Sequence, residues 1–318
     1  TLDKADWNKK PTVGCGPYVL KEWQTASHLI FTANPTFWLG KPKIDQIFVR
    51  IVPDDAAQVA ALKAGDAEFG TFIAYSDMPD VEKIGTFQFI RAESGYKESW
   101  FFNLSTEAKT KGHPALQDVN VRKAVVMAVD RNKITQELLN GGTKPAVTFW
   151  DWSGSIWASP NVKLIPYDKA GAEKLLDDAG WKKGADGIRA KGGVKLELRY
   201  ATTTREVRKN TQVIVQQMLK DVGIAVKLLN FSSDVFWNSY GDKGPVASGG
   251  YDFAEWSTTC GFPDPDFSYF LCKEIPSDKT PVGGNWSFVG DKALDEALTK
   301  QATLLDPALQ PDRAKLFH

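Results

Sequence analysis

Hydrophobic and polar residues alternate in three short segments near the start of the chain, which predicts strands over 18–23, 28–33 and 44–52. The spacing of apolar residues then becomes helical over 56–64, between a possible capping residue, Asp54, and Gly65. The first part of the chain is therefore predicted to be rich in strands and to contain one early helix.

The second half of the chain alternates between strand and helix patterns. A strand over 194–200, a helix over 205–222 and a strand over 224–229 have the lengths of a β-α-β unit, which predicts a parallel sheet. Further strands are predicted over 100–102 and 251–256, and further helices over 119–140, 168–179 and 233–240. The sequence thus predicts an α/β fold.

Composition narrows the class of protein. The 318 residues are 42% hydrophobic, enough for more than one lobe, and the formal net charge of zero argues against nucleic acid as a partner. Three cysteines and three histidines, widely spaced, form no known zinc or iron motif, so neither a metal site nor a cofactor is predicted. No apolar run approaches the ~20 residues of a membrane span.

Since the sequence opens without a leader pattern, we expect any targeting segment to have been removed.

Enzyme motifs do not emerge from the sequence. Residues 153–155 (SGS) are no nucleophile elbow, and residues 14–16 (GCG) precede a strand and not a helix, so they form no phosphate-binding loop. We therefore predict that the protein is not an enzyme.

Five groups of residues, in this order and spacing, carry a specific resemblance. They are 16–23 (GPYVLKEW); 34–45 (NPTFWLGKPKID); 121–124 (VRKA) with 128–131 (AVDR); 167–168 (YD) with 175–176 (LL) and 179–181 (AGW); and 262–266 (FPDPD). The chain resembles the family-5 extracellular solute-binding proteins of ABC transporters, the oligopeptide- and dipeptide-binding type. The resemblance implies an α/β, periplasmic-binding-protein type II-like fold, with two lobes of mixed sheets joined by a hinge near 100–104. Residues 1–101 would form the central part of the first lobe and residues 102–318 the second lobe, with both ends of the protein missing.

The resemblance also implies a function. Such a protein would capture an oligosaccharide or oligopeptide between its lobes and deliver it to ABC permease subunits. It would be a monomer in the periplasm or at the cell surface, peripheral to the membrane and directed there by a lipid or a signal peptide. The alternatives are a sensor that presents its ligand to a chemoreceptor and, last, a carbohydrate-active enzyme.

The 11 tryptophans are candidates for either core packing or ligand stacking. Those inside strands or packing motifs are expected to fill the core: Trp23, Trp38, Trp100 and Trp181. Those in the aromatic loop 149–157 and in the strand over 251–256 are the candidates for ligand contact: Trp150, Trp152, Trp157 and Trp256. We also expect Thr71 and Phe72 to contact the ligand.

Peptide-binding relatives carry an aspartate just before the Pro-Asp-Pro segment, which pairs with the ligand's amino terminus. Here the equivalent position is Gly261 or Thr259, depending on the alignment, and neither is acidic. Asp264 lies nearby but is flanked by prolines, as in a turn. With Thr258, Thr259 and Asn285 as neutral hydrogen-bonding groups, this departure places oligosaccharide slightly above peptide.

The cysteines Cys260 and Cys272 flank the Pro-Asp-Pro segment. We predict that they form a disulfide, which agrees with the extracytoplasmic location that the resemblance implies. Two free thiols are the alternative.

Overall fold

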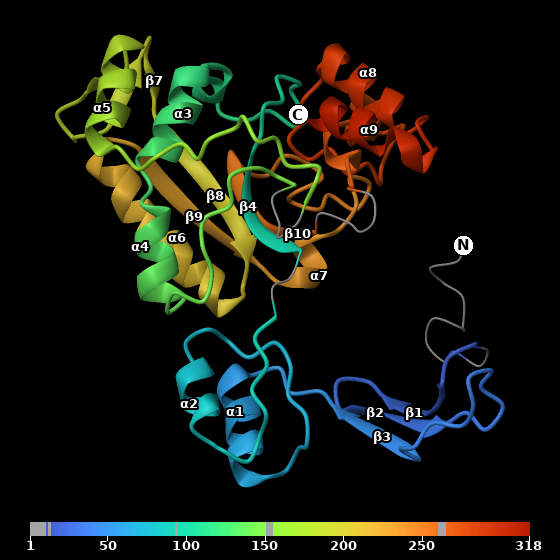
Figure 1. The fold of residues 1–318 in the computed structure, drawn as a ribbon. Helices are drawn as coiled ribbons and strands as arrows, with labels where there is room; N and C mark the ends of the chain where they lie inside the picture. Colours follow the sequence, from blue (N-terminus) through green and yellow to red (C-terminus); the bar gives the residue numbers. More distant parts are fainter. Residues whose placement is uncertain (1–10, 12–13, 93–94, 151–154, 260–264) are drawn as a thin grey trace. The chain divides into compact units, whose positions relative to one another are not determined.

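The computed structural model describes residues 11, 14–92, 95–150, 155–259 and 265–318. The chain divides into two compact units, Thr1–Ile90 and Arg91–His318, and each is described by itself (Figure 1). Within the described ranges, no helix has the length and apolar character needed to cross a membrane.

The first unit holds a small antiparallel sheet and two helices. Its strands are β1 (Tyr18–Gln24), β2 (His28–Ala33) and β3 (Gln46–Arg50), in the order β1-β2-β3. Helix α1 (Asp55–Ala64) begins where the Asp54 carboxylate accepts a hydrogen bond from the Ala57 N–H at 2.8 Å, and it packs on α2 (Met78–Glu82). The predicted strands and helix of this part are confirmed, but the sheet is antiparallel and not mixed.

The boundary between the units lies earlier than the predicted one, which was between residues 101 and 102. Strand β4 (Tyr96–Phe102) pairs along its whole length with β10 (Phe253–Thr259) of the second unit. The predicted boundary and the predicted hinge at 100–104 therefore fall within or directly after a strand of the second unit. The observed division lies between Ile90 and Arg91.

The second unit is built on a four-stranded mixed sheet in the order β4-β10-β8-β9. Helix α6 (Glu206–Asp221) connects β8 (Glu197–Thr203) to β9 (Ala225–Phe231), and these two strands are parallel, which confirms the predicted β-α-β unit. Strand β10 runs parallel to β8, whereas β4 runs antiparallel to β10.

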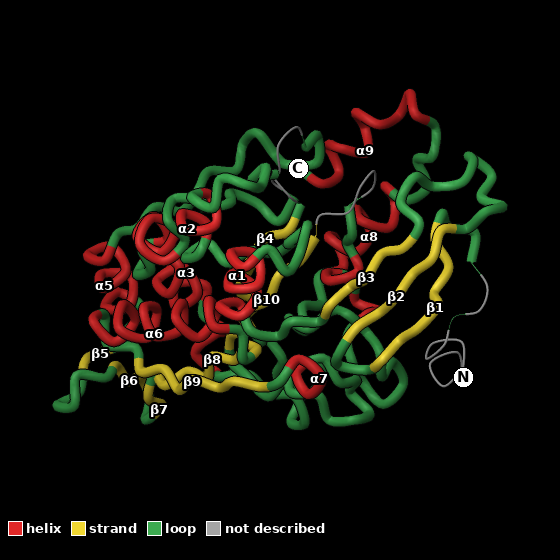
Figure 2. Tube along the Cα trace, turned by 90° about the horizontal axis from the view of Figure 1, so that it is seen from below, coloured by secondary structure: helices red, strands yellow, loops and turns green. Residues whose placement is uncertain are grey.

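Helices cover one face of this sheet. Buried residues of α3 (Val119–Met127), α5 (Lys169–Asp178) and α6 form one apolar cluster with β8 and β10, and these helices lie together in Figure 2. The helix predicted over 119–140 is interrupted at residues 128–130, because the Asp130 side chain caps a new helical segment. That segment comprises α4 (Arg131–Lys133) and the π-helical turn η4 (Ile134–Leu138).

Shorter elements complete the second unit. A three-stranded sheet follows α5, and the paired helices α8 and α9 close the chain (Figure 1). The remaining elements are β5 (Lys182–Lys183), β6 (Arg189–Lys191), β7 (Val194–Lys195), η3 (Pro114–Gln117), α7 (Ser233–Phe236), η5 (Ser268–Phe270), η6 (Cys272–Glu274), α8 (Lys292–Gln301), η7 (Pro307–Leu309) and α9 (Gln310–Phe317).

Strand β10 is buried on both faces, and its side chains alternate between two clusters. Phe253 packs in the cluster formed with α3, α5 and α6, whereas Ala254 and Trp256 pack in a second cluster on the opposite face. Asp252, just before the strand, and Glu255, within it, are 2% and 3% exposed. Both carboxyl groups therefore need partners inside the protein.

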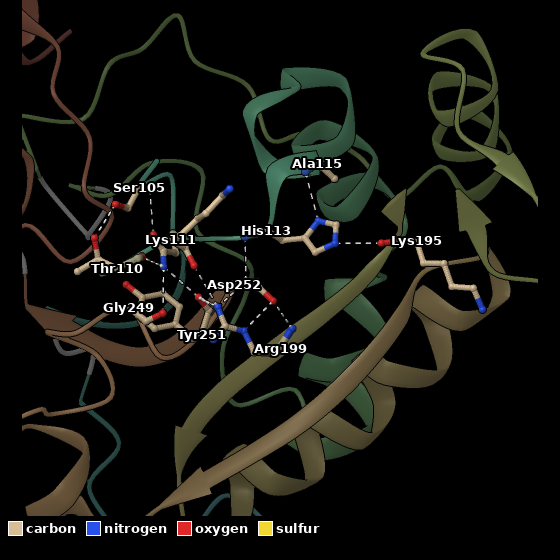
Figure 3. A network of polar contacts seen from close by, with 11 residues as sticks. Ser105, Thr110, Lys111, His113, Ala115, Lys195, Arg199, Gly249, Tyr251 and Asp252 are labelled. Carbon is tan, nitrogen blue, oxygen red and sulfur yellow. Dashed lines mark hydrogen bonds and ion pairs between the residues drawn. The ribbon is translucent and has the colours of Figure 1, made fainter. Parts of the chain in front are cut away.

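The Asp252 carboxylate fixes the segment that follows β4. It accepts hydrogen bonds from the backbone N–H groups of His113 and Arg199, at 2.9 and 2.7 Å, and from the Arg199 guanidinium. Figure 3 shows Arg199 and His113 converging on this carboxylate. One buried side chain thereby ties the segment before η3 to β8 and β10.

Close backbone packing supports the same junction. The buried Asn103 amide donates to the carbonyls of Thr110 and Tyr251, at 2.9 and 3.0 Å. Gly249 lies beside Thr110 with a φ of +70°, and a Cβ atom there would lie 2.3 Å from the Thr110 carbonyl oxygen. Only glycine fits this position.

Glu255 lies on the face of β10 that points toward α6. Tyr200 donates a hydrogen bond from its hydroxyl to Glu255, and the Trp100 indole donates to the Tyr200 hydroxyl at 3.1 Å. Burial raises the pKa of Glu255 to about 8, against the lowering effect of the Tyr200 hydrogen bond. The side chain is therefore mostly protonated at neutral pH.

Replacing Asp252 tests its role in the fold. Asp252→Ala leaves two backbone N–H groups and the Arg199 guanidinium without their acceptor, so we expect the free energy of unfolding to fall by about 3 kcal/mol or more. Urea denaturation measures this change. Asp178→Ala removes an exposed carboxylate that pairs with Lys174 at 2.6 Å, and it is expected to leave stability almost unchanged. Equal effects of the two substitutions would contradict the assignment.

Glu255→Gln tests the protonation state. The pKa of Glu255 is about 8 in the folded protein and 4.5 as an ordinary value, so the folded state holds an extra proton between these pH values. Wild-type stability should fall as pH rises through this window, relative to the variant, by roughly 3 kcal/mol between pH 5 and pH 8. Urea denaturation across this range is the measurement, with the exposed Glu137→Gln as control. Parallel curves for wild type and Glu255→Gln would show that Glu255 is not held protonated.

Candidate ligand-binding site

The carboxyl ends of three parallel strands meet at one edge of the second unit's sheet. Strands β8, β9 and β10 end there at Thr203, Phe231 and Thr259. In open α/β sheets, ligands bind outside the carboxyl ends of the strands. This edge is therefore the candidate site, and it includes the predicted ligand residues Trp256, Thr258 and Thr259.

A polar cluster occupies this edge. Arg208, in the first turns of α6, donates from Nε and Nη2 to the two carboxylate oxygens of Glu98, at 3.2 and 2.9 Å. Its Nη2 also donates to the Ser257 hydroxyl at 2.8 Å. The Arg208 side chain is 9% exposed and that of Glu98 is 41% exposed. The cluster thus presents a carboxylate to solvent and holds it in place with a buried guanidinium.

Trp256 lies inside an aromatic cluster and is 1% exposed. Its ring stacks on Phe101, with ring centres 4.0 Å apart and an interplanar angle of 3°, and contacts Trp237 and Trp286 edge-on. One face of the predicted stacking platform is therefore already occupied by a protein ring. Among the described residues, the buried indole N–H groups of Trp256 and Trp286 have no hydrogen-bond partner.

Trp150 and Trp157 pack together with the end of the chain. Both rings contact Phe317 of α9, at centre distances of 4.9 and 5.2 Å, and the Arg313 guanidinium lies 5.2 Å from the Trp157 ring centre. Trp157 is 2% exposed, whereas Trp150 is half-buried and donates its indole N–H to the Asp266 carbonyl at 3.4 Å. These contacts give both tryptophans a role in packing α9.

The polar residues predicted for the site differ in exposure. Thr258 is 2% exposed and Asn285 is fully buried, whereas Thr259 is exposed at the end of β10. The Asn285 amide donates to the carbonyls of Leu271 and Val289, at 3.0 and 2.9 Å, so its donors are used within the protein. Of these three, Thr259 is the side chain open to a ligand.

Thr71 and Phe72 belong to the first unit, in the loop between α1 and α2. Both are exposed, and the Phe72 ring is 81% exposed at a φ of 56°. The Thr71 carbonyl accepts a hydrogen bond from Gln58 at 2.8 Å, which holds this loop against α1. An exposed aromatic residue in a left-handed conformation is a feature that recurs at binding sites.

Several predicted residues lie outside the described ranges: Trp152, Gly261, Asp264 and Cys260. Cys272 is described, and its thiol is free, with Sγ 3.9 Å from the Asp291 carbonyl oxygen. The predicted Cys260–Cys272 disulfide is therefore not formed in this structure. Burial, together with the Asp295 carboxylate, raises the pKa of the Cys272 thiol.

Sequence reasoning missed the polar cluster, although weak signals were present. Glu98 stands just before the apolar strand predicted over 100–102, and Glu255 stands in the strand predicted over 251–256, which also contains Asp252. Neither signal identifies Arg208 as the partner. The described residues contain no group of three or more His, Cys, Asp or Glu side chains arranged to bind a metal ion.

Comparison with known proteins places the fold and the family. Residues 1–274 match the family described as bacterial extracellular solute-binding proteins, family 5 Middle. The oligopeptide-binding protein AppA of Bacillus subtilis (strain 168) is 30% identical over 233 residues, which are 71% of this chain and 41% of that protein. The aligned stretch thus spans less than half of this relative.

Two solved structures share the fold. The structure of AppA from Bacillus subtilis in complex with a nonapeptide matches with a TM-score of 0.79 at 23% identity, over 99% of this chain and 60% of that one. NikZ from Campylobacter jejuni in complex with Ni(L-His) matches with a TM-score of 0.80 at 26% identity, over the same shares of 99% and 60%. The α/β, periplasmic-binding-protein type II-like fold is confirmed by these matches. The chain belongs to the family-5 bacterial extracellular solute-binding proteins.

Proposed function

We propose that this chain is part of the substrate-binding subunit of an ABC importer, which captures an oligopeptide between two lobes and delivers it to permease subunits. The match of residues 1–274 to the solute-binding family carries this proposal. A sheet edge that carries polar groups on one face and an aromatic cluster on the other supports it. We place the subunit in the periplasm or at the cell surface, as a monomer without catalytic activity.

Peptide replaces oligosaccharide as the favoured ligand. The expectation that ranked oligosaccharide slightly higher is not supported, since the curated relative reported above is named for oligopeptides and its structural counterpart holds a nonapeptide. A sensor role has no support from these relatives either.

The ligand residues that we propose come from both units. From the second unit, Thr259 and the exposed part of Glu98 offer hydrogen-bonding groups, and the half-buried Trp150 offers part of its ring. From the first unit, Thr71 and Phe72 offer a backbone segment and an apolar surface.

A thermal-shift screen of the full-length protein tests the ligand class. A ligand that binds only the folded state raises the melting temperature, so we expect a pool of short peptides to raise it and a matched pool of oligosaccharides to leave it unchanged. A shift with oligosaccharides alone would overturn the peptide assignment.

Phe72→Ala tests the contribution of the first unit. Because this ring is 81% exposed, its removal should leave the melting temperature of the free protein unchanged. We expect it to weaken peptide binding about tenfold or more, as loss of an apolar anchor does. Isothermal titration measures the affinity, and Trp38→Ala, which removes a 78% exposed ring from the same unit, is the matched control. Equal affinity of both variants would exclude Phe72 from the site.

A further inference from the structure

We propose that the Glu98–Arg208 ion pair sets the charge preference of the ligand site, so that the protein binds the uncharged part of a peptide at the end of β10 and does not select for a free amino terminus. This inference rests on the proposed peptide-binding function.

The position of the pair connects it to the ligand. In the pairing of β4 with β10, Glu98 lies opposite Ser257, which is two residues before the end of β10 at Thr259. Arg208 follows the carboxyl end of β8. Both charges therefore lie at the edge where the parallel strands end.

The geometry of the ion pair leaves the Glu98 carboxylate able to accept a further hydrogen bond from a ligand. The Arg208 guanidinium donates to both Glu98 oxygens, to Ser257 at 2.8 Å and to the Thr203 hydroxyl at 2.9 Å, so most of its donors are used. The Ser257 hydroxyl donates to Glu98 as well. A carboxylate has about four lone-pair sites, so Glu98 can accept at least one more hydrogen bond from its exposed side.

The charges of this cluster cancel. Glu98 contributes one negative charge and Arg208 one positive charge, and the neighbouring Glu255 is protonated at neutral pH because burial raises its pKa. The next charged pair on α6, Glu206 with Lys209, is also balanced, at 2.6 Å. The cluster therefore offers a fixed hydrogen-bond acceptor without a net negative charge that would attract an ammonium group.

Removing one charge at a time should create a preference that the wild type lacks. Arg208→Met keeps most of the side-chain volume and leaves Glu98 unbalanced, which favours a cationic ligand group. Glu98→Gln keeps an acceptor oxygen and leaves Arg208 unbalanced, which disfavours such a group. The double variant restores neutrality and serves as the matched control.

The probes differ in a single charge. One is a pool of amidated pentapeptides of uncharged residues with free amino termini, and the other is the same pool after acetylation. Isothermal titration with the full-length protein gives the affinity ratio of the two pools. We expect a ratio within about threefold for wild type and the double variant, at least tenfold in favour of free amines for Arg208→Met, and at least tenfold in favour of acetylated peptides for Glu98→Gln.

Other affinity ratios would contradict either this inference alone or the proposed function as well. A tenfold preference of the wild type for free amines, or a ratio that neither single variant changes, overturns this inference and leaves the peptide function intact. If neither pool binds the wild type, the proposed function fails and this inference fails with it. If Arg208→Met does not fold, Glu98→Gln alone decides, because this side chain is 41% exposed and glutamine keeps an oxygen that can accept from Arg208.

Discussion

The burial of β10 on both faces is the constraint on which the second unit depends. The strand lies between β4 and β8, with apolar clusters on either side, so the buried carboxyl groups in it and just before it need partners within the protein. Asp252 is paired with Arg199, Glu255 accepts from Tyr200, and Ser257 joins Arg208 and Glu98. Of these groups, Ser257 with Arg208 and Glu98 lies at the carboxyl edge of the sheet, where a ligand is expected, whereas Asp252 lies at the opposite end of the strand.

Local patterns in the sequence predicted most of the elements, since alternation and helical spacing are properties of neighbouring residues. The β-α-β unit around α6 is the clearest case. That β4 belongs to the sheet of the second unit could not be predicted from local patterns. Trp100 of β4 pairs with Glu255, about 150 residues later, and no residue near position 100 indicates that partner. The break at residues 128–130 was missed because one capping side chain, Asp130, outweighs a continuous apolar pattern.

The tryptophans show that residue type alone does not predict which side chains are exposed. A large apolar ring favours burial, but its actual exposure depends on which elements meet above it. Trp38, expected in the core, is 78% exposed, whereas Trp256, expected to face the ligand, is 1% exposed. The polar cluster was missed for a related reason, since its three members come from β4, α6 and β10 and meet only after the sheet has formed.

The burial of Trp256 and the partial exposure of Glu98 change which side chains we expect to discriminate between ligands. A ligand that stacked on the covered face of Trp256 would have to displace Phe101, whose ring lies 4.0 Å away, and so lose an aromatic contact worth about 0.5–1.5 kcal/mol before gaining one of similar size. No such exchange is needed at Glu98, whose carboxylate is already oriented by Arg208 and partly open to solvent. The aromatic cluster therefore contributes to packing within the second unit, and at the site proposed here we expect the polar edge of the sheet to distinguish one ligand from another.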